Sequence, residues 1–201
     1  MGWVGKHTLL IHKTSGSFFV LGELFTSLEL PFDQATTKHC GSCSACIDIC
    51  PTQAIVEPYL LDARKCIAYL TIEFQGIIPL ELRRGIGNRV FGCDDCQLIC
   101  PWNSFAKTTP IDDFNPRHGL DDIQLIDLWQ WDENTFMANT EGSPLRRTGY
   151  QSFMRNVAIG LGNAPFSDEI LQQLQASRPE LNDIVQVHID WAIQEQLMKR
   201  H

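Results

Sequence analysis

The sequence predicts an α+β fold in three parts: a short N-terminal α/β remnant, a cysteine-rich centre and a C-terminal array of α-helices. Three observations lead to this prediction. Short apolar runs alternate with Gly and Ser in the first 30 residues, all eight cysteines lie between Cys40 and Cys100, and amphipathic segments follow Pro116. The expected domains are residues 1–35, 36–110 and 111–201.

The composition is that of a globular chain with a buried core. The chain has 201 residues, of which 44% are apolar. The apolar stretch from Ser17 to Phe25 is interrupted by Gly22 and Glu23 and is shorter than the roughly 20 residues that a membrane span needs. No signal-peptide pattern is found, so we expect a cytoplasmic protein. The net charge of −8 disfavours nucleic-acid binding driven by bulk charge.

The first 30 residues are typical of the end of an α/β unit. The apolar runs Thr8–Ile11 and Phe18–Leu21 predict two short strands, and a helix is expected to begin near Glu23. The polar segment Pro31–His39 is expected to link this remnant to the cysteines. Because Met1 leads directly into a loop, we also expect that an upstream segment is missing.

The first cysteine motif is a compact C-x2-C-x2-C-x3-C-P run. It contains Cys40, Cys43, Cys46 and Cys50 and ends at Pro51. This spacing is typical of ferredoxins with two 4Fe-4S clusters, in which the fourth cysteine binds the other cluster. We expect Cys50 to begin a helix that points away from the first three thiols, with Pro51 in its first turn.

The second motif repeats the C-x2-C-x3-C-P ending. It consists of Cys93, Cys96 and Cys100 before Pro101, and Cys66 is its displaced first member. A pseudo-two-fold fold would then give four thiolates to each cluster. The predicted ligands are Cys40, Cys43, Cys46 and Cys100 for cluster 1 and Cys50, Cys66, Cys93 and Cys96 for cluster 2.

Zinc sites and disulfides are the two alternative uses of the cysteines. Two zinc sites would also use eight cysteines, but zinc requires neither the third closely spaced cysteine nor the two Cys-Pro endings. Disulfides need an oxidising compartment, which the sequence does not indicate. The motifs therefore favour a ferredoxin-like domain with two clusters.

The remaining elements are expected to be helical. Gly and Pro at positions 76, 79, 85 and 87 predict a loop between the two motifs. The expected helices are Cys66–Phe74, Leu120–Trp131, Gly149–Leu161, Ser167–Ala176 and Leu181–Lys199. Their apolar stripes suit stacked helices, so the C-terminal part resembles a small HEAT-like array.

Six stretches of the chain resemble one enzyme family, the epoxyqueuosine reductases. These stretches are residues 2–10, 16–23, 40–50, 66–73, 87–103 and 142–150. The resemblance implies a cobalamin-dependent oxidoreductase that reduces epoxyqueuosine to queuosine in tRNA, with electrons relayed through two 4Fe-4S clusters to cobalamin. It also implies that the chain is the C-terminal part of such an enzyme, and that the catalytic acid lies upstream, so no catalytic residue is assigned here.

The resemblance further implies partners and cofactor contacts. The expected partners are the tRNA anticodon stem-loop and an electron donor such as a flavodoxin or ferredoxin system, without a membrane. The residues expected to border cobalamin are Lys6, Ala68, Gln75, Asp94 and Asp95. Ala68 stands where the family more often has serine, so a hydrogen bond is expected to be lost there.

A small basic and aromatic group is the candidate tRNA site. Arg146, Arg147, Tyr150 and Arg155 could bind phosphates and stack on a base, since arginine pairs bidentately with phosphate. The alternative is an ordinary solvated helix start. Two other functions remain open, namely a reductive-dehalogenase-like enzyme with the same cofactors and a non-catalytic two-cluster electron-transfer subunit.

Overall fold

The computed structural model describes residues 2–34, 36–176 and 178–200 and divides into two compact units. The cysteine unit consists of Met1–Ala63 and Asp94–Ile111, and the helical unit consists of Arg64–Cys93 and Asp112–His201. These boundaries differ from the three consecutive domains expected from the sequence. The N-terminal residues group with the cysteines, and residues 64–93 group with the helices, because each unit is assembled from two separate stretches of chain.

The cysteine unit begins with an antiparallel hairpin. Strand β1 (Trp3–Val4) pairs with β2 (Leu10–Ile11), and Trp3 lies opposite Ile11. Both of these side chains are buried. Gly2 is required at the start of the hairpin, because a Cβ atom there would lie 1.9 Å from the carbonyl oxygen of Ile11. The strand expected at Thr8–Ile11 is confirmed in its second half.

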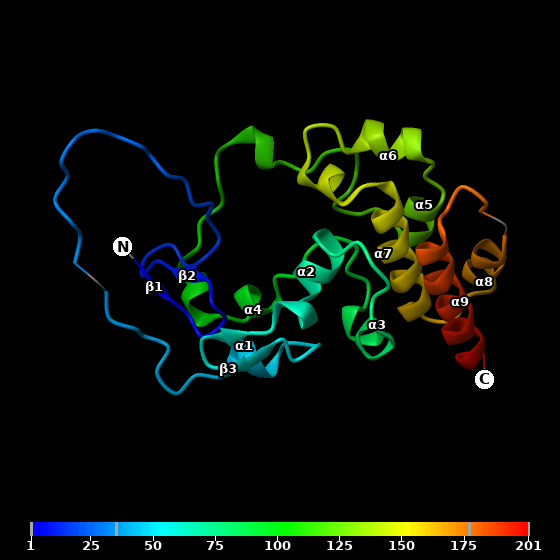
Figure 1. The fold of residues 1–201 in the computed structure, drawn as a ribbon, viewed down its shortest axis with the longest axis horizontal. Coiled ribbons are helices and arrows are strands. Elements are labelled where there is room, and N and C mark those ends of the chain that lie inside the picture. The colour runs from blue at the N-terminus through cyan, green and yellow to red at the C-terminus, as the bar shows by residue number, and fades with distance from the viewer. Residues whose placement is uncertain (1, 35, 177, 201) are drawn as a thin grey trace. The chain divides into compact units, whose positions relative to one another are not determined.

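The chain from residue 18 to residue 34 has no helix or strand, and Figure 1 draws it as a long blue loop. The predictions of a strand at Phe18–Leu21 and of a helix near Glu23 were therefore wrong. Apolar side chains in this stretch are exposed, including Leu24 at 97% and Phe25 at 93%. A strand here has no neighbouring strand to pair with in the cysteine unit, so its apolar pattern alone does not produce one.

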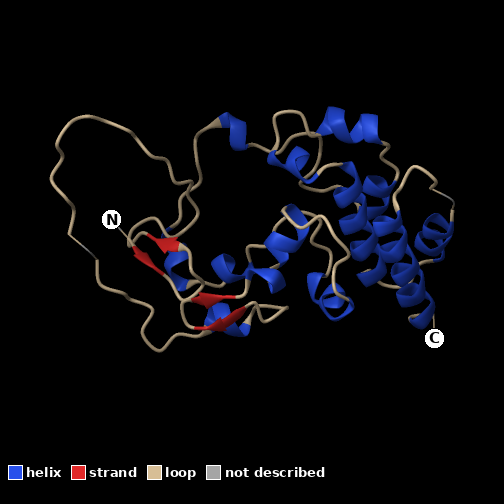
Figure 2. Ribbon diagram, viewed as in Figure 1, coloured by secondary structure: helices blue, strands red, loops and turns tan. Residues whose placement is uncertain are grey.

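The rest of the cysteine unit is built from short elements around the cysteines. The helices are α1 (Ala45–Asp48) and α4 (Asp95–Leu98), and a 3-10 helix, η2, covers Pro101–Phe105. A second hairpin pairs β3 (Ile55–Glu57) with β4 (Leu60–Leu61), as the red arrows of Figure 2 show. The 3-10 helix η1 (Ala63–Lys65) follows it.

The helical unit contains the longer helices, and its described residues form no strand. Its helices are α2 (Ile67–Ile72), α3 (Leu80–Ile86), α5 (Leu125–Trp129), α6 (Glu133–Asn139), α7 (Tyr150–Asn163), α8 (Asp168–Gln175) and α9 (Asp183–Met198), with the 3-10 helices η3 (Asp112–Phe114) and η4 (Pro144–Thr148). The chain as described is thus mostly helical. None of the helices in its described part is both long enough and apolar enough to cross a membrane.

Helix α7 is the centre of the helical unit and is buried along almost its whole length. It packs against α9, α5, α3 and α2, and Figure 1 shows α7 and α9 running side by side. Glycine makes this close approach feasible. A Cβ atom at Gly162 would lie 2.7 Å from the ring of Trp191 and 2.9 Å from the Cα atom of Ala192.

The expected helices match the structure best where the apolar stripe is long. Those expected at 66–74, 149–161, 167–176 and 181–199 are present as α2, α7, α8 and α9. Only the 125–129 part of the segment expected at 120–131 is helical. The sequence missed α3, because Pro79 and Gly87 predict a loop, whereas in the structure they are its N-cap and C-cap residues. It also missed α6, which Asp132 caps by accepting a 2.7 Å hydrogen bond from the backbone N–H of Thr135.

Candidate metal centre

The two cysteine motifs adopt the same backbone geometry. The residue before α1, Ser44, has φ −120° and ψ 4°, and the residue before α4, Asp94, has φ −114° and ψ 15°. The residues after the two helices, Ile49 and Ile99, agree as closely, at φ −77° in both. The helices α1 and α4 also pack against each other. The backbone of the two motifs thus has the pseudo-two-fold repeat that the sequence predicted.

Four cysteine thiols line one cavity in the cysteine unit, which we call the first-cluster cavity. Its volume is about 70 Å³. The cysteines are Cys40, Cys43, Cys46 and Cys100, and the other lining residues are Lys6, His7, Ile11, His39, Ala45, Pro101 and Trp102. The cysteines come from the first motif and from the end of the second, as expected for the ligands of cluster 1. The structure therefore brings together the four thiols that the spacing assigned to one cluster.

The thiols at this cavity influence one another electrostatically. Burial raises the pKa of Cys46 most, and the charges of Cys100, Cys40 and Cys43 raise it further. Burial also raises the pKa of Cys100, while hydrogen bonds from the backbone at Trp102 and Asn103 lower it. Positively charged iron would remove the repulsion among these thiolates, so the donor set suits an iron–sulfur cluster.

The four cysteines of the first-cluster cavity line one space. In residues 2–34, 36–176 and 178–200, no group of three or more His, Cys, Asp or Glu residues is arranged to hold a single metal ion. A cube of four irons and four sulfides is bound by thiols placed around its corners. The arrangement at the first-cluster cavity fits such a cube.

Lys6 holds the loop that carries the first cysteines. Its Nζ atom donates hydrogen bonds to the carbonyl oxygens of Gly41, at 2.7 Å, and of Cys43, at 2.8 Å. Gly41 lies in a turn and has a φ of +49°, a left-handed conformation that favours glycine. Lys6 is one of the residues expected from the sequence to border cobalamin. In the cysteine unit its ammonium group binds the loop that carries Cys40 and Cys43.

A second set of contacts attaches the N-terminal residues to the second motif. The backbone N–H of Ser17 donates to Oδ1 of Asn103 at 2.6 Å, and the Ser17 hydroxyl donates to Oε1 of Gln97 at 2.9 Å. The Asn103 amide donates to the backbone oxygen of Gln97 at 2.6 Å. Gly16 lies directly beneath, since a Cβ atom there would be 2.1 Å from Oδ1 of Asn103. No sequence motif predicts this contact, because Ser17 and Asn103 are more than 80 residues apart.

The aromatic residues that line the first-cluster cavity are His7, His39 and Trp102. The rings of Trp3 and Trp102 meet edge to face with centroids 4.8 Å apart, and Trp3 meets His39 at the same distance. His7 is buried, with 3% of its surface exposed. It is not among the site residues expected from the sequence. Burial lowers its pKa, so the imidazole is neutral.

The four predicted ligands of cluster 2 are divided between the units, and their grouping remains a prediction. In the cysteine unit, Cys96 lies in α4, and the sulfur of Cys50 accepts a hydrogen bond from the backbone N–H of Ala54 at 3.2 Å. In the helical unit, Cys66 is the N-cap residue of α2, and Cys93 packs against the apolar core.

The expectation that Cys50 begins a helix was wrong. Pro51 and Thr52 form a turn, and the helix of this motif, α1, precedes Cys50. At the second motif the expectation is closer, since Pro101 begins the 3-10 helix η2.

The other residues assigned to cobalamin lie in both units. In the cysteine unit, Asp94 is the N-cap residue of α4 and accepts a hydrogen bond from the Gln97 amide at 3.0 Å, and Asp95 lies in the first turn of α4. In the helical unit, Ala68 lies in α2, and the amide oxygen of Gln75 accepts a hydrogen bond from the Ser152 hydroxyl at 2.8 Å.

The residues assigned to tRNA divide into two exposed or partly exposed arginines and two buried residues. Arg147 in η4 is exposed and forms an ion pair with Glu73 at 2.7 Å. Arg146 is partly buried, and its guanidinium donates to the carbonyl oxygen of Met137. These two side chains are the ones in this group that a ligand at the surface of η4 could reach.

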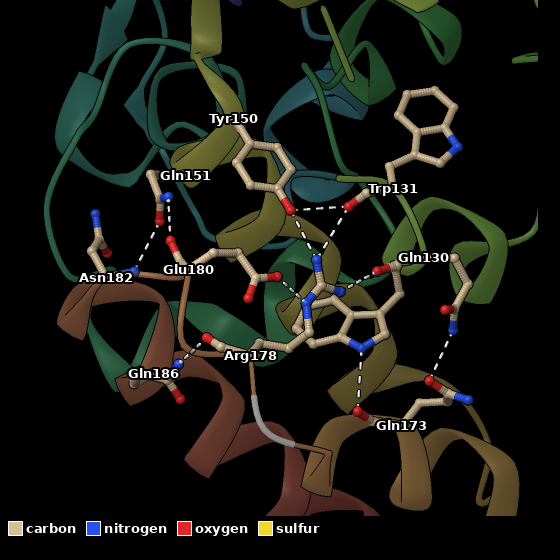
Figure 3. A network of polar contacts seen from close by, with 10 residues as sticks. Gln130, Trp131, Tyr150, Gln151, Gln173, Arg178, Glu180, Asn182 and Gln186 are labelled. Atoms are coloured by element: carbon tan, nitrogen blue, oxygen red, sulfur yellow. Dashed lines mark hydrogen bonds and ion pairs between the residues drawn. The ribbon is translucent and has the colours of Figure 1, made fainter. Parts of the chain in front are cut away.

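Tyr150 and Arg155 are buried and satisfied within the helical unit, which corrects the expectation that they contact RNA directly. The Tyr150 hydroxyl donates to the carbonyl oxygen of Trp131 at 2.9 Å (Figure 3). Arg155 is 1% exposed and donates to three backbone oxygens at and after the end of α2, those of Leu70, Phe74 and Gly76. Burial lowers the pKa of Arg155 to about 10.

Arg178 is the hub of a further network, shown in Figure 3, that the sequence did not indicate. Its guanidinium donates to the carbonyl oxygen of Trp129 at 2.6 Å, to that of Trp131 at 3.2 Å and to the Tyr150 hydroxyl at 2.8 Å. It also lies 5.2 Å from the ring centroid of Trp129 and pairs with Glu180. Through these contacts the loop before α9 supports the start of α7.

The chain is similar to known proteins over most of its length. Residues 39–103 match the family described as a 4Fe-4S double cluster binding domain. An epoxyqueuosine reductase of Pseudomonas aeruginosa is 57% identical over 194 residues, which cover 96% of this chain and 54% of that protein. The chain spans about half the length of the curated relatives it matches.

Solved structures give the same result. The structure of an epoxyqueuosine reductase from Bacillus subtilis has a TM-score of 0.87 and 28% identity, covering 97% of this chain and 52% of that one. A crystal structure of an epoxyqueuosine reductase with a tRNA stem loop modified with epoxyqueuosine has a TM-score of 0.88 and 28% identity, with the same coverage of each chain. The double-cluster region of the sequence is thus placed within a fold that has solved relatives.

Proposed function

We propose that this chain, which matches epoxyqueuosine reductases over about half their length, is the cluster-bearing part of such an enzyme and takes part in reducing epoxyqueuosine to queuosine in tRNA. The observation that carries the proposal is the first-cluster cavity, in which Cys40, Cys43, Cys46 and Cys100 surround one space. These four cysteines lie within the region that matches a double 4Fe-4S family. A cavity lined by four thiols suits electron transfer better than substrate binding.

In this proposal the chain's own residues bind and shield the clusters. The four cysteines at the cavity hold cluster 1, Lys6 fixes their loop through two carbonyl groups, and Trp102 with its aromatic neighbours helps to exclude water from one side. The second cluster would be held by Cys50, Cys66, Cys93 and Cys96. When bound, the clusters supply low-potential electrons one at a time, and cobalamin supplies a reactive metal at the substrate.

Cobalamin is proposed to lie near Lys6, Ala68, Gln75, Asp94 and Asp95. The support is the resemblance together with the position of Asp94 and Asp95 between the cysteines of the second motif. No proton donor for the epoxide oxygen is assigned to this chain, and we propose that this acid lies in the part of the enzyme outside the sequence. The first 35 residues are proposed to belong to the same cofactor-binding domain, and the helices to a HEAT-like array.

The proposed partner is a tRNA stem-loop carrying epoxyqueuosine, which one of the related structures contains. Arg146 and Arg147 are the proposed phosphate contacts, because guanidinium groups bind phosphate bidentately. Tyr150 and Arg155 are proposed to act indirectly, Tyr150 by holding the start of α7 to Trp131 and Arg155 by holding the end of α2. The electron donor is proposed to be a flavodoxin or ferredoxin system of the cytoplasm.

A chimera tests the activity directly. The matching half of the Pseudomonas aeruginosa relative is replaced by this chain, and conversion of epoxyqueuosine to queuosine in tRNA is measured anaerobically with reductant and cobalamin. We expect turnover by the chimera and none by a matched chimera carrying Cys46→Ser. A chimera that folds, holds its iron and sulfide and still leaves epoxyqueuosine unchanged would contradict the proposal.

Three measurements on the same protein separate the alternatives. A reductive-dehalogenase-like enzyme would bind cobalamin but not the modified stem-loop, so tRNA binding distinguishes that function. An electron-transfer subunit would hold about eight irons without cobalamin. Iron and sulfide content, bound cobalamin and stem-loop affinity therefore identify each alternative before turnover is measured.

A further inference from the structure

One polar atom at the first-cluster cavity has no partner. The Nε2 atom of His7 is buried and makes no hydrogen bond within the described part of the chain. The other ring nitrogen, Nδ1, accepts a hydrogen bond from the backbone N–H of Leu9 at 3.1 Å. An imidazole whose Nδ1 accepts carries its proton on Nε2, so the unpartnered atom is a donor.

The ring of His7 is closely packed and lines the first-cluster cavity. The backbone of Gly5 packs against the Cε1–Nδ1 edge of the ring, since a Cβ atom at Gly5 would lie 2.9 Å from Cε1 and 3.3 Å from Nδ1 of His7. His7 itself lines the cavity together with Cys40, Cys43, Cys46 and Cys100. A buried N–H without a partner is unfavourable, and sulfur at this cavity would satisfy it.

The other two basic side chains at the cavity are already engaged. The ammonium group of Lys6 is used by the carbonyl oxygens of Gly41 and Cys43. His39 is exposed, and its Nε2 atom lies 3.2 Å from the hydroxyl of Thr37. Among these three residues, His7 is the buried one, and its N–H donor has no partner in the described part of the chain.

We propose that Nε2–H of His7 donates a hydrogen bond to a sulfur of cluster 1 and thereby raises the reduction potential of that cluster. The inference rests on the proposed cluster binding. Reduction adds one electron to the cluster and increases the negative charge on its sulfurs, and a donor at the sulfur stabilises that reduced state. His7 is thus a tuning residue for one of the two clusters.

The test uses the full chain, reconstituted anaerobically and titrated potentiometrically with detection by EPR. We expect His7→Phe to disfavour the reduced state of one cluster about tenfold, which is about 59 mV for a one-electron couple, and to leave the other unchanged. His7→Gln, which keeps an N–H donor, should recover much of this shift. Unchanged potentials in His7→Phe overturn the inference.

His12 provides the matched control. Its Nδ1 atom likewise accepts from a backbone N–H two residues later, that of Thr14 at 3.4 Å, but His12 is partly exposed and does not line the cavity. His12→Phe should leave both potentials at their wild-type values. An equal shift in His12→Phe would show a general effect of the hairpin and would also overturn the inference.

A measurement with His7 in place does not depend on how the His7 variants fold. Chain labelled with 15N-histidine and carrying His39→Gln is reduced and examined by pulsed EPR, and we expect a weak coupling between a cluster spin and an imidazole nitrogen. Absence of that coupling contradicts the inference. Iron and sulfide analysis comes first, so a chain that holds both clusters but lacks the coupling refutes the role of His7 and leaves the proposed function standing. A chain that holds no cluster refutes both.

Discussion

Single cationic side chains repeatedly take the place of regular backbone pairing in this molecule. Lys6 binds two carbonyl oxygens of the first cysteine loop. Arg155 binds three carbonyl oxygens at and after the end of α2, and Arg178 binds two carbonyl oxygens at and after the end of α5. Loops leave carbonyl groups unpaired, and a buried unpaired carbonyl is costly. A positively charged side chain with several donors satisfies them together and fixes the loop in one conformation.

Lys6 illustrates the consequence for the cluster. We expect Lys6→Met to weaken the first cysteine loop by about 2 kcal/mol, because two charge-assisted hydrogen bonds are lost from a partly exposed site. The reconstituted variant should then lose the iron of cluster 1 to a chelator faster than the wild type. Lys13→Met, at an exposed position in the adjacent turn, is the control. Equal rates of iron loss in all three proteins would mean that Lys6 does not support the loop.

His188 makes the stability of the helical unit depend on pH. Its ring is fully buried between the backbone N–H of Ile78, which donates to Nε2 at 3.1 Å, and the carbonyl oxygen of Ile184, 2.7 Å from Nδ1. Burial, with smaller contributions from the charges of Arg83 and Arg155, lowers the pKa of His188 from 6.5 to about 4.

The sign of this pH dependence follows from proton uptake. Between pH 6.5 and about 4 the unfolded chain binds the proton and the folded chain does not, so stability is full above this range and falls as the pH decreases. The loss from His188 amounts to about 2 kcal/mol at pH 5 and reaches about 3 kcal/mol near pH 4. Denaturant unfolding at pH 7.5 and 5 should show it, and His188→Gln should flatten the dependence. His118→Gln, at an exposed histidine, should behave as the wild type.

At the scale of elements, contacts outside the helix determine whether the short segments are helical. Helices α1 and α4 have four residues each, which is far too short for stability in isolation. They are held by their packing on each other and by the cysteine loops on either side. Helix α7, in contrast, is long and buried, and it organises the helical unit around itself.

Arg155 and Arg147 lie close in sequence but differ in function, since Arg155 is buried and binds backbone carbonyl groups whereas Arg147 is exposed and forms an ion pair. Arg155→Met removes the donors of three buried carbonyl groups at the end of α2, and we expect a loss of about 3–5 kcal/mol in unfolding free energy. Arg147→Met removes an exposed ion pair and should change stability by less than about 1 kcal/mol. Denaturant titration of both variants measures the difference.

Binding of a tRNA stem-loop should show the opposite ranking. Arg147→Met should weaken binding and reduce its salt dependence, since one phosphate contact is lost. Arg155→Met, assayed well below its unfolding midpoint, should bind much as the wild type does. If Arg147→Met binds the stem-loop as tightly as the wild type at every salt concentration, the proposed phosphate contact is wrong.

At the scale of the whole molecule, the cysteines connect stretches of chain that are distant in sequence. The cysteine unit takes Cys40–Cys50 from one stretch and Cys96 and Cys100 from another, while Cys66 and Cys93 belong to the helical unit. The loading of the clusters should therefore be linked to the folding of the chain, because ligand sets assembled from separate stretches do not exist in the unfolded state.

The exchange of the fourth cysteine between the two motifs has a measurable signature. We expect Cys50→Ala to lose cluster 2 and to retain cluster 1 with about four irons, although Cys50 belongs to the first motif. Cys46→Ala should instead lose cluster 1. Iron and sulfide analysis with EPR of the reduced proteins distinguishes the two. Loss of cluster 1 in Cys50→Ala, with cluster 2 intact, would mean that each motif binds its own cluster.

Much of the candidate site could be predicted from the sequence, because its information is local. The C-x2-C-x2-C-x3-C-P spacing predicted the repeat of two motifs, and Cys40, Cys43, Cys46 and Cys100 do line one cavity. Helices with long apolar stripes, such as α7 and α9, were also predicted. The exposed stretch after Phe18 was not, because its strand-like pattern has no partner in the described chain.

The sequence by itself determined the kind of metal centre and predicted the four cysteines that line the first-cluster cavity, since thiol spacing is a property of neighbouring residues. Only the tertiary structure decided that His7 faces that cavity, that Lys6 serves the cysteine loop and that Tyr150 and Arg155 are buried. The physical reason is that burial and hydrogen-bond partners depend on segments that are far apart in the chain. Whether an arginine meets solvent or a carbonyl group is settled when those segments pack together.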